Sequence, residues 1–157
     1  MNRPDKVTFL EPGQLQEREL VLALNRYIPA DPEREWVPAY HFSMVNGHST
    51  EVMGSIDLRI GNTDKLVLYR GQIGYNVKPK FRGHHYAARS VRLLLPLAAR
   101  HQLNPVWITC DPDNLASRRT CELAGAEFVE IIEVSSDEEM YQCGIRQKCR
   151  YKLETTF

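Results

Sequence analysis

The stretch VKPKFRGHHYAARS, Val77–Ser90, joins a strand-like segment to a helix-like one. Before it, Ile73, Tyr75 and Val77 alternate with other residues at the two-residue period of a strand. After Gly83, apolar residues recur at helical spacing. The first N–H groups of a helix have no intrahelical partner and carry the positive end of its dipole. The stretch therefore predicts an anion site suited to a pyrophosphate, with an ordinary solvated helix start as the alternative.

The side chains of this loop are compatible with a bound anion. Lys78, Lys80 and Arg82 supply positive charge, and Gly83 lets the backbone approach an anion closely. His84 and His85 could donate from their imidazoles to phosphate oxygens, or they could point to solvent. The sequence leaves both alternatives open.

The segments before the loop predict strands and one helix. Short alternating apolar runs bounded by Pro, Gly or Asn-Gly indicate strands, and apolar residues three or four apart indicate a helix. The predicted elements are a strand over 7–10, a helix over 15–28, a hairpin of strands 40–45 and 52–60 about Asn46-Gly47, and a strand over 66–77.

The segments from the loop onward predict two helices and three strands. These are a helix over 82–101, with Pro96 expected to kink or break it, a strand over 106–110, a helix from the DPDN turn to Ala124 followed by Gly125, and strands over 128–134 and 146–153. The strand–helix–strand unit predicts a parallel crossover. The predicted fold class is therefore α/β (α+β), a mixed central sheet flanked by helices.

Length and composition indicate one soluble domain over residues 1–157. Apolar residues make up 43% and charged residues 25%, which is ordinary for a globular protein. Lys+Arg and Asp+Glu are both 20, and this balance argues against a nucleic-acid binder. No apolar run reaches the roughly 18–20 residues of a membrane span, and the N-terminal residues do not resemble a signal peptide. A homodimer is left open.

The four cysteines predict reduced thiols in a cytoplasmic protein. They are Cys110, Cys121, Cys143 and Cys149, and no two of them form a C-x-x-C pair. A zinc site is therefore not expected, and no other metal is implied. A chain with its own core does not need disulfides, so cytoplasmic localisation is the expectation.

Two motifs resemble those of the GNAT superfamily of acetyl-CoA-dependent N-acetyltransferases. The family's central motif is a strand, then V-x-P-x-x-[RQ]-G-x-G-x-[AG], then a long helix; here it stands as Val77, Pro79, Arg82, Gly83 and Ala87. About thirty residues later the family has a strand and then N-x-x-[AS] with a glycine further on, matched here by Asn114, Ser117 and Gly125. The resemblance covers nearly the whole chain, most specifically residues 72–128.

The resemblance implies acetyl-CoA as cosubstrate and a place for each part of it. The strand ending at Val77 would splay from the strand at 106–110, and the pantetheine arm would lie in the gap. The amides of residues 82–87 would hold the pyrophosphate. The implied coenzyme-binding residues are Tyr75, Val77, Arg82, Gly83, His84, His85, Tyr86, Ala87, Asn114 and Ser117.

Two positions depart from the family motifs. His85 replaces the second glycine of the loop, and we expect it to keep right-handed helical backbone angles. Cys121 replaces the tyrosine that often protonates the leaving thiolate of coenzyme A. The thiol could take over as general acid, or it could be a small buried residue. We favour the second interpretation, because a cysteine is shorter than a tyrosine and an apolar surround makes a thiol inert.

The sequence does not identify the catalytic residues. The glutamate that serves as base in the histone-acetylating branch corresponds to Gln72, which cannot accept a proton. The catalytic candidates are Cys121, Asp111 and Tyr75, with Asp57 and His41 as further bases; Asp111 has the alternative of a turn residue. A water chain to bulk solvent could also remove the proton.

An amine acceptor is implied, but the sequence does not identify it. Its pocket is expected between the predicted helix 15–28 and the loops 30–38 and 135–141. These loops carry an acidic excess that could attract a cationic amine or be merely solvated: Asp31, Glu33, Glu35, Asp137, Glu138 and Glu139. The leading function is an N-acetyltransferase that acts by direct attack on the thioester. The alternative is a catalytically weak acetyl-CoA-binding sensor or scaffold.

Overall fold

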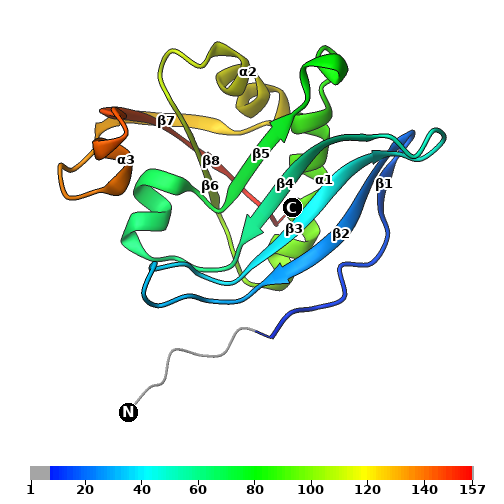
Figure 1. Cartoon of the computed structure of the whole chain (residues 1–157), viewed down its shortest axis with the longest axis horizontal. Coiled ribbons are helices and arrows are strands. Elements are labelled where there is room, and N and C mark those ends of the chain that lie inside the picture. Colours follow the sequence, from blue (N-terminus) through cyan, green and yellow to red (C-terminus); the bar gives the residue numbers. More distant parts are fainter. Residues whose placement is uncertain (1–7, 157) are drawn as a thin grey trace.

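The structure is a computed structural model that describes residues 8–156, and its strands form two antiparallel sheets (Figure 1). The first sheet has five strands in chain order: β1 (Leu15–Glu17), β2 (Leu20–Ile28), β3 (Ala39–Asn46), β4 (Val52–Arg59) and β5 (Ile73–Val77). The second has the order β6-β8-β7, with β6 (Val106–Cys110), β7 (Glu127–Glu133) and β8 (Gln147–Leu153).

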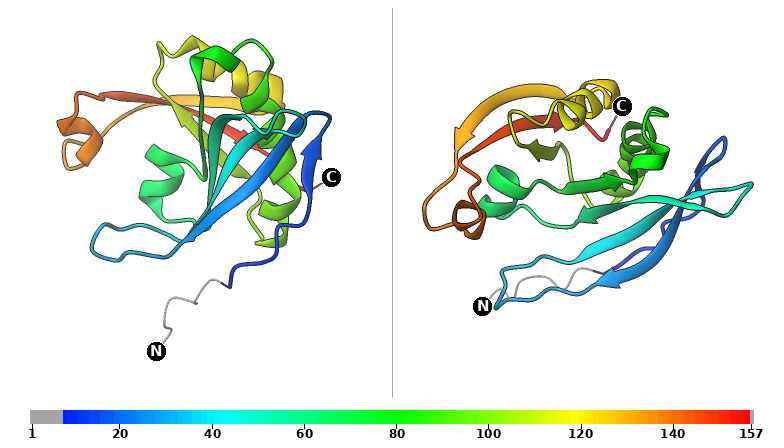
Figure 2. Two further views of the ribbon diagram at one scale, coloured as in Figure 1. Left: turned by 45° about the vertical axis from the view of Figure 1, so that its right-hand side comes forward. Right: turned by 45° about the horizontal axis from the view of Figure 1, so that its top comes forward.

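Within the described residues, three α-helices accompany the sheets: α1 (Tyr86–Arg100), α2 (Leu115–Ala124) and the short α3 (Glu139–Gln142). Helix α1 packs on the first sheet, and α2 contacts both α1 and the second sheet (Figure 2). The core lies between α1 and the inward faces of the strands, and includes Tyr40, Phe42, Leu58, Val91 and Leu94. No helix within residues 8–156 is long and apolar enough to cross a membrane.

The predicted helix over 15–28 is wrong, because the segment forms the antiparallel pair β1 and β2. Arg18, at the turn between them, has a positive φ of 53°. Leu20 and Leu22 point into the core, while Val21 between them is only half-buried. Pairing with β3 along the whole of β2 satisfies the backbone, and this tertiary context outweighs a helical spacing of leucines.

The strand predicted at 7–10 does not form in its described part, Thr8–Leu10, and Val7 lies outside the described residues. The segment is held by side chains instead. The Leu10 N–H donates to the buried Tyr40 hydroxyl at 2.7 Å, and the Phe9 ring packs on Tyr27 and Tyr40. It therefore covers the core without adding a strand.

The strand predicted over 66–77 is correct only in its second half. Leu66–Arg70 forms a single π-helical turn, closed by a hydrogen bond from the Gly71 N–H to the Leu66 carbonyl at 2.6 Å. Gly71 has a φ of 74°, and a Cβ there would lie 2.6 Å from the Trp107 carbonyl oxygen. Glycine is needed where the chain turns and passes this close to β6.

The long helix predicted over 82–101 is confirmed in position but begins later, at Tyr86. A 3₁₀ turn, Pro79–Phe81, precedes it. The helix continues through Pro96 to Arg100, so the predicted break is absent. The hairpin at Asn46-Gly47, the helix ending at Ala124 and the last three predicted strands are confirmed within a few residues.

The crossover from β5 through α1 to β6 leaves these two strands without a ladder. The expected parallel pairing is therefore not made, and every ladder within residues 8–156 is antiparallel. The fold class itself, an α+β arrangement of sheets flanked by helices, is confirmed. Backbone contact between the two sheets is made at Gly71, which bridges Ile108, and at Gln72, whose N–H donates to the Trp107 carbonyl at 2.8 Å.

Candidate active site

The loop between β5 and α1 leaves free amides at the helix N-terminus. The first helical hydrogen bond runs from the Arg89 N–H to the His85 carbonyl at 2.9 Å, so the amides just before Arg89 have no intrahelical acceptor. Gly83 has a φ of 96°, and the space about its Cα is open. His85 has a φ of 60°, so the expected right-handed conformation is wrong. The backbone keeps the left-handed turn of the missing glycine despite the imidazole.

The side chains of the loop are arranged unevenly about these amides. Arg82 is exposed, and its Nε donates to the Val77 carbonyl at 3.2 Å. His84 is exposed, with its ring centroid 5.4 Å from that of Tyr86. The Tyr86 hydroxyl lies 3.4 Å from a Glu19 carboxylate oxygen, so only its backbone faces the loop. Ala87 is buried, and its small side chain lets α1 pack close to the sheet.

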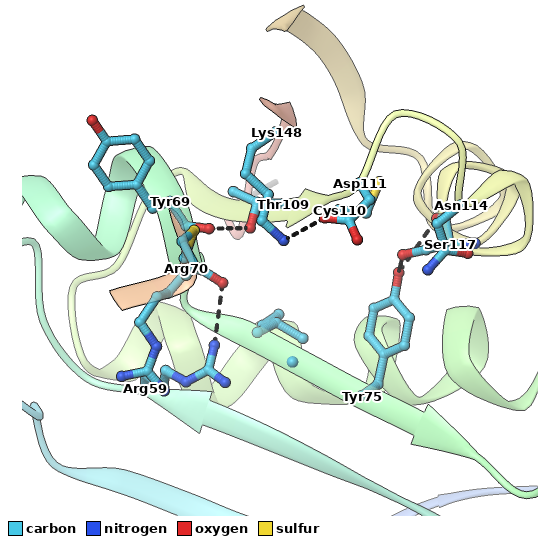
Figure 3. Close-up of a pocket in the computed structure, with 13 residues that line it drawn as sticks. Arg59, Tyr69, Arg70, Tyr75, Thr109, Cys110, Asp111, Asn114, Ser117 and Lys148 are labelled. Carbon is cyan, nitrogen blue, oxygen red and sulfur yellow. Dashed lines mark hydrogen bonds and ion pairs between the residues drawn. The ribbon is translucent and has the colours of Figure 1, made fainter. Parts of the chain in front are cut away.

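Strands β5 and β6 diverge beyond Gln72, and a cavity of about 320 Å³ lies in the gap (Figure 3). The Gln72 side chain is fully buried where the two sheets meet. Its Oε1 accepts from the Trp107 N–H at 2.6 Å, and its Nε2 donates to Gly61 and Asn62. Among the residues that line the cavity are Tyr75, Cys110, Asp111, Asn114 and Ser117.

Tyr75 extends from β5 across this gap to α2. Its hydroxyl lies 2.6 Å from the Ser117 Oγ and 3.8 Å from the Cys121 Sγ (Figure 3). Burial raises the pKa of Tyr75 far above its usual range, so the phenol keeps its proton at neutral pH. A phenol from β5 thus reaches the surroundings of residue 121.

Cys121 is fully buried, and burial raises the pKa of its thiol to about 12. Burial likewise raises the pKa of the Cys110 thiol to about 11. Both groups are protonated and unreactive near neutral pH. All four cysteines are free, and Cys143 is the exposed one.

The turn after β6 holds two of the predicted residues. Asn114 caps α2, and its Oδ1 accepts from the Ser117 N–H at 3.1 Å. The Asp111 Oδ1 lies 3.0 Å from the Nζ of Lys148, which is largely buried. The Asp111 carboxylate is therefore engaged by a cation at the edge of the cavity.

A second cavity, of about 1,040 Å³, adjoins the first. We call the first the inner cavity and the second the outer cavity. The loops 30–38 and 135–141 both line it, as predicted, but strand β2 replaces the predicted helix as its third side. Glu33, Glu35, Asp57, Asp137, Glu138 and Glu139 contribute carboxylates, and Arg26, Arg34, Arg59, Lys65 and Arg70 contribute positive charges. The charges nearly balance, so the predicted acidic excess is not a property of the cavity. Asp31 is not among its lining residues.

His41 and Asp57 form a hydrogen-bonded pair across strands β3 and β4. Asp57 lines the outer cavity, and both side chains are partly exposed. Among the candidate bases, this pair therefore places a carboxylate on the outer cavity. Gln72, at the position of the family's glutamate, instead uses its side-chain amide to join the two sheets.

Sequence reasoning did not identify the basic groups that line the inner cavity, Arg59, Arg70 and Lys148. Arg59 and Lys148 lie in segments that read as alternating surface strands, where a charged residue is unremarkable. Arg70 lies at the end of the π-helical turn, in a segment for which the sequence predicted a strand. No local signal in the sequence distinguishes these residues from solvated ones.

Comparison with known proteins agrees with the fold. The family model for the acetyltransferase (GNAT) domain matches residues 1–127. A comparison with curated protein sequences finds no match. A Vibrio cholerae protein proposed to be a ribosomal-protein-serine acetyltransferase aligns with a TM-score of 0.64 at 14% identity, over 92% of this chain and 99% of that one.

Two further solved structures contain the cosubstrate or its product. RimL, a ribosomal L7/L12 alpha-N-protein acetyltransferase in complex with coenzyme A, aligns at 18% identity over 78% of this chain and 64% of its own, with a TM-score of 0.57. The microcin C7 self-immunity acetyltransferase MccE, in complex with acetyl-CoA and AMP, aligns at 17% identity over 74% of this chain and 61% of its own, also with a TM-score of 0.57. Because the family model covers most of its length, the chain belongs to the GNAT family of acetyltransferases.

Proposed function

We propose that this acetyltransferase moves the acetyl group of acetyl-CoA to an amine by direct attack on the thioester. The observation that carries the proposal is the gap between β5 and β6, which contains a neutral phenol and opens into the larger cavity. The free amides of α1 lie at the other end of β5, where a pyrophosphate would be stabilised. Coenzyme A bound in two related structures supports this assignment.

The proposed coenzyme site follows β5 and the two helix N-termini. The pantetheine would hydrogen-bond the β5 backbone near Tyr75 and Val77, which has no ladder partner on the β6 side within residues 8–156. The pyrophosphate would lie on the amides of Gly83, His84, His85, Tyr86 and Ala87, with Arg82 nearby. Asn114 and Ser117, at the start of α2, would contact the pantetheine.

We assign the general acid to Tyr75. As the amine nitrogen bonds to the thioester carbon, the C–S bond breaks and the sulfur accepts the phenol proton; Ser117, hydrogen-bonded to the phenol, would relay a replacement proton from solvent. Burial raises the pKa of the neighbouring Cys121 thiol to about 12. A coenzyme thiolate that leaves into this poorly solvated gap would also be desolvated, which raises its basicity and favours its protonation.

The proton of the attacking amine would leave through Asp57 and His41. Asp57 lines the outer cavity, from which the acceptor must enter, and His41 is hydrogen-bonded to it. Asp111 is ion-paired with Lys148, and Gln72 has no free acceptor. Correct positioning of amine and thioester would supply much of the remaining rate enhancement.

Calorimetry with acetyl-CoA, followed by thiol release on a panel of amines, tests the proposal. Ligand at about 100 times its Kd stabilises the native state by about 2.7 kcal/mol, so the melting temperature should rise by several degrees. Binding heat with acetyl-group transfer to an amine supports the enzyme. Binding without transfer would favour the sensor alternative, for which the inert thiol at position 121 is an argument. If acetyl-CoA produces no binding heat and no thermal shift, the enzyme and the sensor are both excluded.

We further propose that the chain acts as a single domain in the cytoplasm. Four free thiols support a reducing compartment. The zero net charge supports an acceptor other than nucleic acid. A homodimer stays open, and size-exclusion chromatography with light scattering measures it.

A further inference from the structure

Two arginines lie where the inner cavity opens into the outer one. Arg59, on β4, and Arg70, at the end of the π-helical turn, line both cavities. Figure 3 shows their guanidinium groups side by side. Any acceptor that reaches the thioester from the outer cavity must therefore pass beside two positive charges.

The Arg59 guanidinium is held against the backbone of the first sheet. Its Nη1 donates to the carbonyls of Arg70 at 3.2 Å and Gly71 at 3.0 Å. It lies flat across Gly74 of β5, where a Cβ would come within 2.7 Å of the Nη2. A guanidinium has five N–H donors, and these carbonyls accept two hydrogen bonds from it. The group is fixed in place with donors left for a ligand.

Neither arginine has a carboxylate partner. Within residues 8–156, no Asp or Glu oxygen lies within 4.0 Å of either guanidinium. Three other cations that line the cavities do have carboxylate partners: Lys65 has Glu35, Lys148 has Asp111 and Arg34 has Asp31. Asp57, whose charge acts on Arg59, is hydrogen-bonded to His41.

This arrangement places two like charges together, the Arg59 guanidinium partly buried and the Arg70 side chain exposed. Burial, and then the charge of Arg70, lower the pKa of Arg59 to about 10 against a smaller opposing effect of the Asp57 charge. Both effects oppose the charged form, and an anion bound between the two groups would relieve them. Arginine forms paired hydrogen bonds with carboxylate and phosphate oxygens, which suits the free donors.

We propose that Arg59 and Arg70 form an anion subsite for the acceptor, so that the acceptor is an amine bearing a carboxylate or phosphate a few bonds from its nitrogen. This inference rests on the proposed acetyl transfer, because it deepens the acceptor side of that reaction. The two guanidiniums would also lower the pKa of a nearby amine and so increase the neutral, nucleophilic fraction. A purely cationic amine, which the acidic loops suggested, would be repelled at this point.

Matched amine pairs test the proposal by turnover. Each of the twenty α-amino acids is compared with its α-amide, and phosphoethanolamine with ethanolamine, by thiol release from acetyl-CoA. The acid members should have a kcat/KM higher by about tenfold or more, since the loss of one charge-assisted hydrogen bond has an effect of that order. The comparison of amino acids with their amides tests for recognition of a carboxylate, and the comparison of phosphoethanolamine with ethanolamine tests for recognition of a phosphate. A preference for the amides and for ethanolamine would overturn the proposal.

Variants connect the preference to the two arginines. Arg70→Gln removes an exposed side chain and should fold normally, while Arg59→Gln removes a partly buried one. Both should lose most of the preference for acids, with coenzyme A affinity by calorimetry unchanged. Arg34→Gln is the matched control, because Arg34 lines the outer cavity but lies by Asp31 at 3.6 Å. An acid preference that survives in both variants would overturn the assignment.

A binding measurement keeps the subsite testable without turnover. With coenzyme A saturating, so that its own phosphate site is filled, inorganic phosphate should raise the melting temperature of the wild type more than that of Arg70→Gln or Arg59→Gln. Equal shifts in all three would overturn the subsite, whatever the turnover. If coenzyme A fails to bind but phosphate still distinguishes the variants, the proposed acetyl transfer fails and the subsite stands.

Discussion

At position 121 a tyrosine expected from the family is a cysteine, and a tyrosine from another element reaches the same surroundings. The sequence showed the substitution and offered Tyr75 as a catalytic candidate, but it did not show that the Tyr75 hydroxyl lies beside residue 121. Tyr75 looked like an alternating strand residue, and only the divergence of β5 from β6 brings its hydroxyl to 3.8 Å from the Cys121 Sγ. Arg59 is similar, since its role depends on the neighbouring Gly74 and Arg70 rather than on any motif.

We predict that Tyr75→Phe lowers kcat by about 10²-fold or more, the usual effect of losing a general acid. The ring stays, so acetyl-CoA affinity and melting temperature should change little. Because burial raises the pKa of Tyr75 far above 10, wild-type turnover should not fall as pH rises through 10 for want of the phenol proton. Stopped-flow turnover with calorimetry measures both. An unchanged kcat in Tyr75→Phe would remove the phenol from the mechanism.

The companion variant Cys121→Ala should behave in the opposite way. Loss of one buried sulfur should lower the free energy of unfolding by about 1 kcal/mol. Turnover should stay within a few-fold of wild type, because the thiol, with a pKa of about 12, packs rather than reacts. Thermal melts and the same kinetic assay decide. A collapse in turnover at unchanged stability would make Cys121 the acid instead.

At the scale of elements, the sequence predicted those with local signals: the Asn-Gly hairpin, the capped helix α2, and the loop before α1. It failed at β1–β2, where leucines at helical spacing are paired as strands. It also failed at the π-helical turn, whose shape depends on the close approach of Gly71 to Trp107. In both cases contacts with distant strands decide the conformation, and a window of sequence does not contain them.

The loop before α1 gives a pair of matched variants. Gly83→Val puts a β-branched residue at a φ of 96°, which only glycine adopts readily, and should weaken acetyl-CoA binding by about tenfold or more. His85→Gly relieves a φ of 60° and should leave binding within a few-fold while keeping or slightly raising the melting temperature. Calorimetry compares the two. Equal loss of affinity in both would mean that the His85 side chain itself contacts the cosubstrate.

We predict that Gln72→Glu is destabilising rather than activating. The Gln72 Nε2 donates to Gly61 and Asn62, and a carboxylate cannot. Burial would raise the folded-state pKa of the new carboxyl above its unfolded value. The deficit of about 1–3 kcal/mol should therefore be smallest below about pH 4, and grow as pH rises through the folded-state pKa. Urea unfolding at several pH values measures it; a faster acetyl transfer with normal stability would contradict this account.

At the scale of the whole molecule, the chain exposes one thiol and shields three. Cys143, which is exposed and lines the outer cavity, should react with a thiol reagent within seconds to minutes. Cys110, Cys121 and Cys149 should react only after unfolding. Mass spectrometry after a short alkylation, with Cys143→Ser as control, counts the labels. Labelling of more than one site in native protein would show that the core opens more readily than the structure indicates.

The joint made by Gln72 and Trp107 has a mechanical consequence. Strands β5 and β6 meet at this joint and diverge beyond it, so a small rotation of one strand about the joint produces a larger change in the width of the gap toward Val77. A molecule lying along the gap and contacting both strands would restrict that rotation. Hydrogen exchange should then slow on the two strands together when acetyl-CoA is added, and the slowing should be greatest in the amides farthest from the joint.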